Sequence, residues 1–220
     1  MGASRAERAP VGVQRRRPTP PQADIVEAAL RFIDAHGLES FSLKALATEL
    51  GMHQPNMYRR FASRRELLDL VVDQIMAEAG EPEVDRADWH AWLLDWGARV
   101  RRAWQQHPRA GALIYHGDER SRTAMDSVLG VLLGSFPEDV VVVAVKAYLS
   151  HVLGATLLEV RAFASDADQG DAPEEVAERY PNAVAFGRLE ELRGATAEQA
   201  DQDFLQGLTI LLDGFRAYVT

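Results

Sequence analysis

Residues 52–61 carry the side chains of this chain that are best suited to recognising another molecule. The segment reads MHQPNMYRRF, and its polar residues surround two apolar ones, Met57 and Phe61, that are spaced to face inward on a helix. Glutamine and asparagine amides can pair with adenine, arginine can pair with guanine through two hydrogen bonds, and a tyrosine hydroxyl can donate to a phosphate. The polar set that indicates nucleic-acid recognition is Gln54, Asn56, Tyr58, Arg59 and Arg60.

The flanking sequence predicts two short helices joined by a turn. Ser42 is a candidate N-cap of the first helix, and Gly51 ends it because glycine readily adopts the left-handed conformation found after helices. Pro55 falls in the first turn of the second helix, where proline is tolerated. We expect further helices over 23–36 and 64–79, so this pattern predicts a helix-turn-helix.

In a helix-turn-helix, the second short helix lies in the major groove of DNA. Lys44 falls in the first turn of the helix before it, and Arg64 falls in the first turn of the helix after it. Ser63 and Glu66 form a capping-box pattern at the start of that later helix. Lys44 and Arg64 therefore flank the recognition surface and suit contacts to phosphates or base edges.

The charge distribution supports this reading, although the net charge of −9 taken alone argues against nucleic acid. Residues 1–65 hold eleven Lys or Arg against six Asp or Glu, whereas residues 66–220 hold thirteen against twenty-seven. A basic head on an acidic body is expected where only the head touches DNA. The alternative is chance together with a basic tail.

The run FSLKALATELGMHQPNMYRRFASRRELLDLVVDQIM resembles the DNA-binding head of the tetracycline-repressor family, over roughly residues 22–79. Leu50-Gly51, Tyr58, Phe61 and Arg64 fill the places that the family pattern requires. Arg60 and Arg64 stand where the family often has His and Lys, and both replacements keep a hydrogen-bond donor. The resemblance implies a DNA-facing set of Lys44, Gln54, Pro55, Asn56, Tyr58, Arg59, Arg60 and Arg64.

The sequence therefore predicts an all-α protein with two folded domains after a tail. Residues 1–21 hold four prolines and five arginines and are expected to be a disordered basic tail, or else an arm that places Arg15–Arg17 in a minor groove. Residues 22–79 form the predicted N-terminal three-helix helix-turn-helix domain. Residues 80–220 form the predicted C-terminal helical bundle for effector binding and dimerisation, after an acidic boundary at 81–88.

Helical periodicity or capping patterns run through most of the predicted body. Only residues 140–145 are ambiguous between helix and strand. The expected helices cover residues 89–107, 108–116, 119–134, 138–164, 174–193 and 196–219.

The closing segment FLQGLTILLDGFRAYV is similar to the last helix of the tetracycline-repressor branch, and the resemblance implies dimerisation through the final helices. Gly207 and Gly214 lie seven residues apart on one helix face, and helical glycines cost stability unless they allow another helix to approach closely. That helix could belong to the same chain, but we favour a partner subunit. The predicted dimer interface contains Gly207, Leu211 and Gly214.

Trp92 and Trp96 follow Trp89 at helical spacing, and such an aromatic stripe is either core or the wall of a pocket. A pocket would take a small hydrophobic or aromatic effector and would need a few polar contacts. The candidate lining residues are Trp92, Trp96, Tyr115, His116, His151 and Thr156. The full set of residues with which tetracycline repressors hold magnesium-tetracycline is not matched, so the resemblance does not favour tetracycline.

Several classes of function are disfavoured. The chain has no cysteine, no HExxH or GxSxG motif and no phosphate-binding glycine loop, so we expect no enzyme, metal or cofactor. No signal peptide is evident, and residues 140–160 are interrupted by polar groups, so we expect a cytoplasmic protein outside the membrane. The predicted function is a homodimeric transcriptional repressor released from a palindromic operator DNA by a small-molecule effector. The alternatives are a dimeric DNA-binding regulator without such a ligand, or a helical enzyme.

Overall fold

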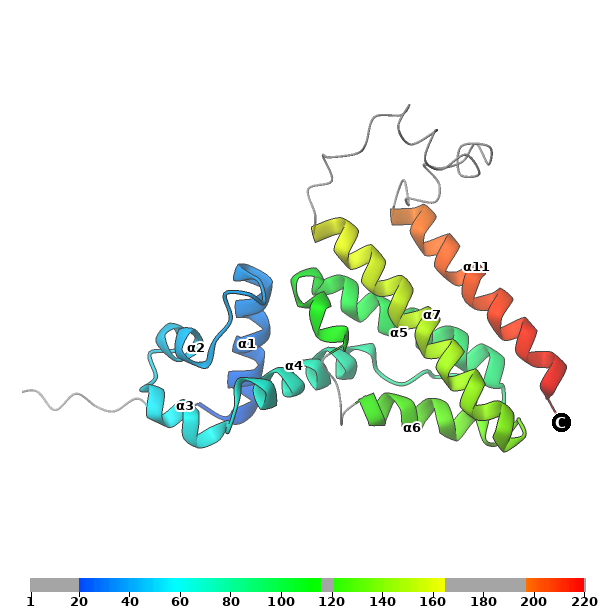
Figure 1. Cartoon of the computed structure of the whole chain (residues 1–220), viewed down its shortest axis with the longest axis horizontal. Coiled ribbons are helices and arrows are strands. Elements are labelled where there is room, and N and C mark those ends of the chain that lie inside the picture. Colours follow the sequence, from blue (N-terminus) through cyan, green and yellow to red (C-terminus); the bar gives the residue numbers. More distant parts are fainter. Residues whose placement is uncertain (1–19, 116–120, 165–196, 220) are drawn as a thin grey trace, which may run out of the picture.

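The computed structural model describes residues 20–115, 121–164 and 197–219, and the chain is helical over these ranges without any strand. A small head and a larger body lie side by side (Figure 1). The head contains α1 (Gln22–His36), α2 (Leu43–Glu49), α3 (Gln54–Arg60) and α4 (Arg64–Ala79). The body contains α5 (Trp89–Gln106), the 3-10 helix η1 (Pro108–Tyr115), α6 (Ser121–Leu132), α7 (Glu138–Ala164), α11 (Ala197–Phe215) and the 3-10 turn η2 (Arg216–Tyr218).

Local signals fix the ends of the head helices. The Ser42 hydroxyl accepts from the backbone N–H of Ala45 at 3.0 Å and so caps α2, and Gly51 follows α2 with φ of 62°. The Ser63 hydroxyl accepts from the Glu66 N–H at 3.1 Å, and the Glu66 carboxylate in turn accepts from the N–H of Ala62 at 2.7 Å. The capping interaction predicted for Ser63 and Glu66 is therefore present, with its return bond one residue earlier than in the standard box.

The two short helices are held by a shared apolar core, because neither is long enough to be stable alone. Met57 in α3 and Phe61 just after it are fully buried, as are Leu46 in α2 and Leu67 in α4. In α3 itself Met57 is the buried residue, so a single side chain and the following phenylalanine anchor this helix. The other faces of α3 remain available to solvent.

The body is built around α5, which packs against both α7 and α11. Gly97 of α5 lies where these helices meet, since a Cβ added there would lie 2.8 Å from Leu208 Cδ2 and 3.0 Å from the Tyr148 hydroxyl. That hydroxyl donates to the Leu93 carbonyl at 2.6 Å, and burial raises the pKa of Tyr148 well above its ordinary value of 10.0. A glycine at 97 is thus a requirement of close helix packing.

The fold class is confirmed, and a few element boundaries differ from expectation. Residues 108–115 form a 3-10 helix, in which Gly111 packs so closely on Val160 that no side chain would fit. The last α-helix ends at Phe215, and η2 tightens the chain beyond it, as 3-10 turns often do at helix ends. Residues 140–145 are helical. The expected helix over 174–193 and the tail up to residue 19 lie outside the described residues.

Residues Glu138–Val160 of α7 are long and apolar enough to cross a membrane by composition alone. A core helix of a soluble protein passes the same test, and here α7 packs against α5, α6, η1 and α11. Within this single chain, however, only 39% of the most apolar window is buried.

Candidate DNA-binding surface and body interior

Helix α3 lies, together with α2, on the side of the head that is away from the body (Figure 1). Tyr58 is 55% exposed although it is a large aromatic residue, and Asn56 is half-buried. Arg59 donates from its guanidinium to the side-chain oxygen of Asn56, so these two groups are already arranged on one face of the helix. The other exposed members of the predicted DNA-facing set on α3 are Gln54, Pro55 and Arg60.

Lys44 lies exposed in the first turn of α2, as the sequence predicts. Its backbone carbonyl accepts from the Thr48 hydroxyl at 2.9 Å within the helix. The structure therefore leaves the Lys44 side chain at the surface of the helix that precedes α3.

Arg64 makes contacts within the head that the sequence did not predict. Its Nε donates to the carbonyl oxygen of Phe41 at 3.0 Å, and its Nη2 donates to that of Leu38, also at 3.0 Å. The guanidinium also lies over the Phe41 ring, 5.6 Å from its centroid. Arg64 thus ties the start of α4 to the loop between α1 and α2, and DNA contact by Arg64 stays a prediction.

Sequence reasoning overlooked His53, the N-cap residue of α3. His53 is exposed, and its carbonyl accepts from the Asn56 N–H at 2.8 Å. Its position directly before Gln54-Pro55 places it beside the predicted DNA-facing set, so a DNA contact by His53 is a further prediction.

The tryptophans proposed for the pocket are packed in the interior of the body. Trp92 is fully buried and Trp96 is 3% exposed, and their rings stack 6.2 Å apart with 12° between their planes. The ring centroids of Trp96 and Tyr148 are 6.0 Å apart. The guanidinium carbon of Arg86 lies 5.3 Å from the ring centroid of Trp92. These contacts correspond to the core alternative that the sequence left open.

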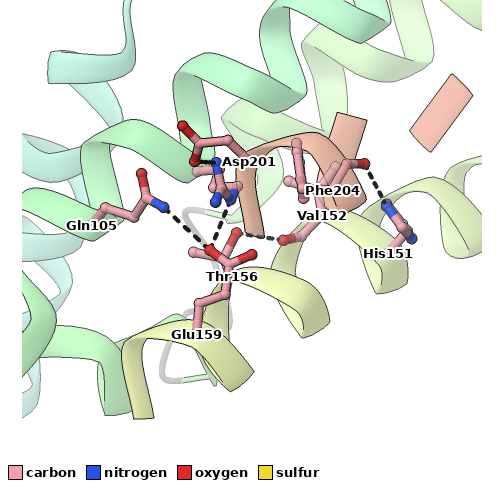
Figure 2. Close-up of polar contacts among 8 residues, drawn as sticks. Gln105, His151, Val152, Thr156, Glu159, Asp201 and Phe204 are labelled. Atoms are coloured by element: carbon pink, nitrogen blue, oxygen red, sulfur yellow. Dashed lines mark hydrogen bonds and ion pairs between the residues drawn. The ribbon is translucent and has the colours of Figure 1, made fainter. Parts of the chain in front are cut away.

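Thr156 and His151, two other residues of the predicted pocket, have polar partners within the body, one in the same helix and one in α11. Figure 2 shows the Thr156 hydroxyl donating to the Val152 carbonyl at 2.6 Å and the His151 ring 3.4 Å from the carbonyl of Phe204. The side chain of Tyr115 is not described, and His116 lies outside the described residues.

A polar cluster that sequence reasoning missed lies where α5, α7 and α11 meet (Figure 2). Arg101 Nε lies 2.8 Å from Glu159 and its Nη1 lies 2.7 Å from Asp201, while Gln105 donates to the same Glu159 oxygen at 3.2 Å. Arg101 Nη2 and the indole N–H of Trp104 are buried donors for which the described residues supply no hydrogen-bond partner. The members of the cluster come from three distant segments, so no local motif marks it.

The predicted interface glycines differ from each other. A Cβ added at Gly207 would lie 2.8 Å from His151 Cε1 of the same chain, which corresponds to the alternative that Gly207 accommodates a neighbouring helix of its own subunit. Within the described parts of the chain, Gly214 has nothing within 4 Å of such a Cβ, and Leu211 is half-buried against the core. The role of all three in a dimer stays a prediction.

In the parts of the chain that the structure describes, no three His, Asp or Glu side chains come together as a metal site requires. The site with an evident arrangement is the exposed face of α3, carried by the head formed by α1 to α4 on a helical body. This architecture defines a helix-turn-helix DNA-binding protein with a separate helical domain.

Comparison with known proteins identifies the family. Residues 25–71 match the bacterial regulatory proteins of the tetR family, and residues 81–219 match the tetracyclin repressor-like C-terminal domain. The chain belongs to the tetracycline-repressor (TetR) family, which confirms the resemblance seen in its sequence. It is therefore a DNA-binding transcriptional regulator of a family in which some members respond to ligands.

Individual relatives agree with this assignment. The tetracycline repressor protein class D of Escherichia coli is 27% identical over 202 residues, which cover 89% of each protein. Among solved structures, the Streptomyces coelicolor TetR family protein ActR in complex with (S)-DNPA superposes with a TM-score of 0.68 at 24% identity, covering 91% of this chain and 98% of that one. A single-residue variant of TetR from Acinetobacter baumannii in complex with minocycline gives 0.67 at 21% identity, covering 90% and 98%. Both structures support the same fold.

Proposed function

We propose that this chain is a cytoplasmic homodimeric repressor that binds a palindromic operator and leaves it when a small hydrophobic or aromatic effector enters the body. The observation that carries the proposal is the exposed polar face of α3, which has Met57 and Phe61 fully buried beneath it and Tyr58 55% exposed. A helix held in this way can enter the major groove without losing its packing.

Dimerisation is supported by apolar surface on α7 and α11, which pack against each other in one chain (Figure 1). Val143 and Leu158 of α7 are 66% and 70% exposed, and Ile210 of α11 is 67% exposed. Exposed apolar side chains on two adjacent helices favour burial against a second copy, because that removes their surface from water. A two-fold dimer would present two α3 helices about one DNA turn apart, roughly 34–36 Å.

Effector binding in the body is supported by the donors of the α5 cluster. A buried donor without a partner costs about 1–3 kcal/mol, and an acceptor group of a bound molecule removes that cost. Arg101 Nη2 and Trp104 Nε1 are such donors. We therefore place the polar contacts of the effector at these residues rather than at Thr156, whose hydroxyl is already bonded to Val152.

Release of DNA requires the effector to bind the DNA-incompetent arrangement more tightly than the competent one. We expect the effector to shift η1, which packs on α1 and α4 of the head as well as on α7. The packed stack of Trp92 and Trp96 favours the second candidate, a dimeric regulator without a small-molecule ligand.

The experiment selects duplexes from a random DNA library with the full-length protein and then tests whether aromatic compounds release the selected duplex. We expect an inverted repeat and release by at least one compound class, with release weakened in Trp104→Phe, which removes the indole N–H. Trp92→Phe is the matched control. Failure to enrich any duplex rejects the function, whereas an enriched repeat that no compound releases favours the ligand-free regulator.

A further inference from the structure

His107 of the body lies between two carboxylates of the head. It follows α5 as its C-cap residue, with Nδ1 2.8 Å from Asp34 Oδ2 on α1 and Nε2 2.9 Å from Glu78 Oε2 on α4. The His107 side chain is 14% exposed, and those of Asp34 and Glu78 are each 32% exposed. One residue of the body therefore contacts two helices of the head.

These two contacts require the charged imidazolium. A neutral imidazole has one N–H donor and one acceptor nitrogen, whereas an ionised carboxylate can only accept. Only the doubly protonated ring can donate to Asp34 and Glu78 together. Burial lowers the pKa of His107, but the hydrogen bonds to Glu78 and Asp34 and their charges outweigh it and hold the pKa above its ordinary value of 6.5.

Asp34 depends on this contact. Its second oxygen, Oδ1, is buried and has no hydrogen-bond partner among the residues that the structure describes, so His107 supplies the compensation for this carboxylate. Replacing the imidazolium by a neutral ring would leave either Asp34 or Glu78 facing a nitrogen lone pair, which is unfavourable at these distances.

A second residue of the body strengthens the same joint, by which we mean the contact between the body at residues 107–109 and helices α1 and α4 of the head. Arg109 donates from its guanidinium to the backbone carbonyls of Ala35 and Asp34, where a cation also favours the C-terminal end of α1. The charged groups that face His107 are thus Asp34 from α1 and Glu78 from α4, with Arg109 close by in η1. His107 and Arg109 flank Pro108, where η1 begins, so a movement of η1 would act on this joint directly.

We propose that His107 is a positioning residue for operator binding, whose imidazolium locks α1 and α4 of the head onto the body and whose deprotonation releases them. The proposal rests on the proposed function as a dimeric operator-binding protein. Because the pKa is raised in the folded protein, the stabilisation is complete below about pH 6.5 and is lost as the pH rises through the folded value. A loosened head must be ordered again on DNA, which weakens binding.

The first test measures the Kd for a duplex that the wild-type protein has selected, at about pH 6 and about pH 9. At the lower pH we expect His107→Gln to bind about three- to tenfold more weakly than wild type, which corresponds to about 0.7–1.4 kcal/mol for a partly exposed charge pair. At the higher pH the two proteins should bind alike. His36→Gln is the matched control, because His36 also lies in the head but packs on Phe32.

A merely structural role would weaken His107→Gln equally at both pH values, and that outcome overturns the proposal. The variant Asp34→Asn/Glu78→Gln keeps the histidine and removes both carboxylates. It should lower the pKa of His107 in an NMR titration and lose the same pH dependence of the Kd. An unchanged His107 pKa in this variant also overturns the proposal.

The second test separates this proposal from the dimer on which it rests. The chain has no cysteine, so Glu49→Cys places one spin label on the exposed end of α2 in each head. In the wild-type protein, double electron–electron resonance should give a narrow distribution of distances between the two labels at about pH 6 and a broader one at about pH 9. In His107→Gln the distribution should be broad at both pH values. Equal widths throughout reject the role of His107, whereas the absence of any dipolar signal rejects the dimer.

Discussion

Arg64 at the start of α4 donates through Nε to the carbonyl oxygen of Phe41 at 3.0 Å, across the loop that leads into α2. A second bond from Nη2 reaches the Leu38 carbonyl at the other end of the same loop. The position that the family pattern assigns to a basic residue near DNA is therefore occupied here by a side chain that fastens the loop between α1 and α2 to the start of α4. We therefore expect Arg64 to affect DNA binding indirectly, by positioning α2 and α3.

The salt dependence of binding distinguishes this role from a phosphate contact. In Arg64→Ala we expect weaker operator binding and a free energy of unfolding lowered by about 1–3 kcal/mol, because two hydrogen bonds donated by an exposed charged group are lost. The slope of the logarithm of the DNA-association constant against the logarithm of the salt concentration should stay unchanged. Lys44→Ala is the comparison, and its slope should fall by about one unit, as for one lost phosphate contact. A reduced slope in Arg64→Ala would instead assign Arg64 to the DNA interface.

Trp96 tests whether the tryptophan stripe is core or pocket wall. In Trp96→Ala we expect the free energy of unfolding to fall by about 3–5 kcal/mol, because the ring is 3% exposed and stacks on Trp92. Thermal or urea denaturation of the variant measures this loss. A variant that keeps wild-type stability but no longer responds to an effector would show that Trp96 lines a cavity.

The apolar face of α7 and α11 predicts how the dimer can be broken. Ile210→Glu places a charge at a side chain that is 67% exposed in the single chain, so we expect the fold to persist and the dimer to dissociate. Sedimentation at micromolar concentration should report a monomer, and operator binding should fall with it. Leu133→Glu is the control, since Leu133 is 55% exposed but lies beyond α6, outside both helices. A dimeric Ile210→Glu would place the interface elsewhere.

The head could be predicted from sequence because its determinants are local. Ser42 and Ser63 cap helices through atoms only three residues away, and Gly51 takes its positive φ within the turn itself. Met57 and Phe61 are buried as their spacing within one short helix requires. Patterns of this kind depend on neighbours in the chain, so the pattern alone is sufficient.

The roles of individual body residues could not be predicted, because their partners are distant in sequence. Helical spacing indicates that Trp92 and Trp96 face inward, but it does not distinguish a packed stack from a cavity wall. Likewise, a glycine such as Gly207 indicates that something approaches closely, and only the fold identifies His151 of the same chain as that group. The contacts of His107 cross 73 and 29 residues of sequence.

The double variant Tyr58→Ala/Arg59→Ala is the decisive test of whether the exposed face of α3 reads DNA. Fluorescence anisotropy would measure the Kd for the duplex selected by the wild-type protein, with Arg102→Ala, an exposed charge on α5, as the control. We predict a Kd that is higher by a factor of about 100 or more for the double variant, equivalent to about 2.7 kcal/mol. The melting temperature should be unchanged, and the control should bind as tightly as the wild-type protein. A folded double variant that binds the duplex with wild-type affinity would show that α3 is not the recognition helix.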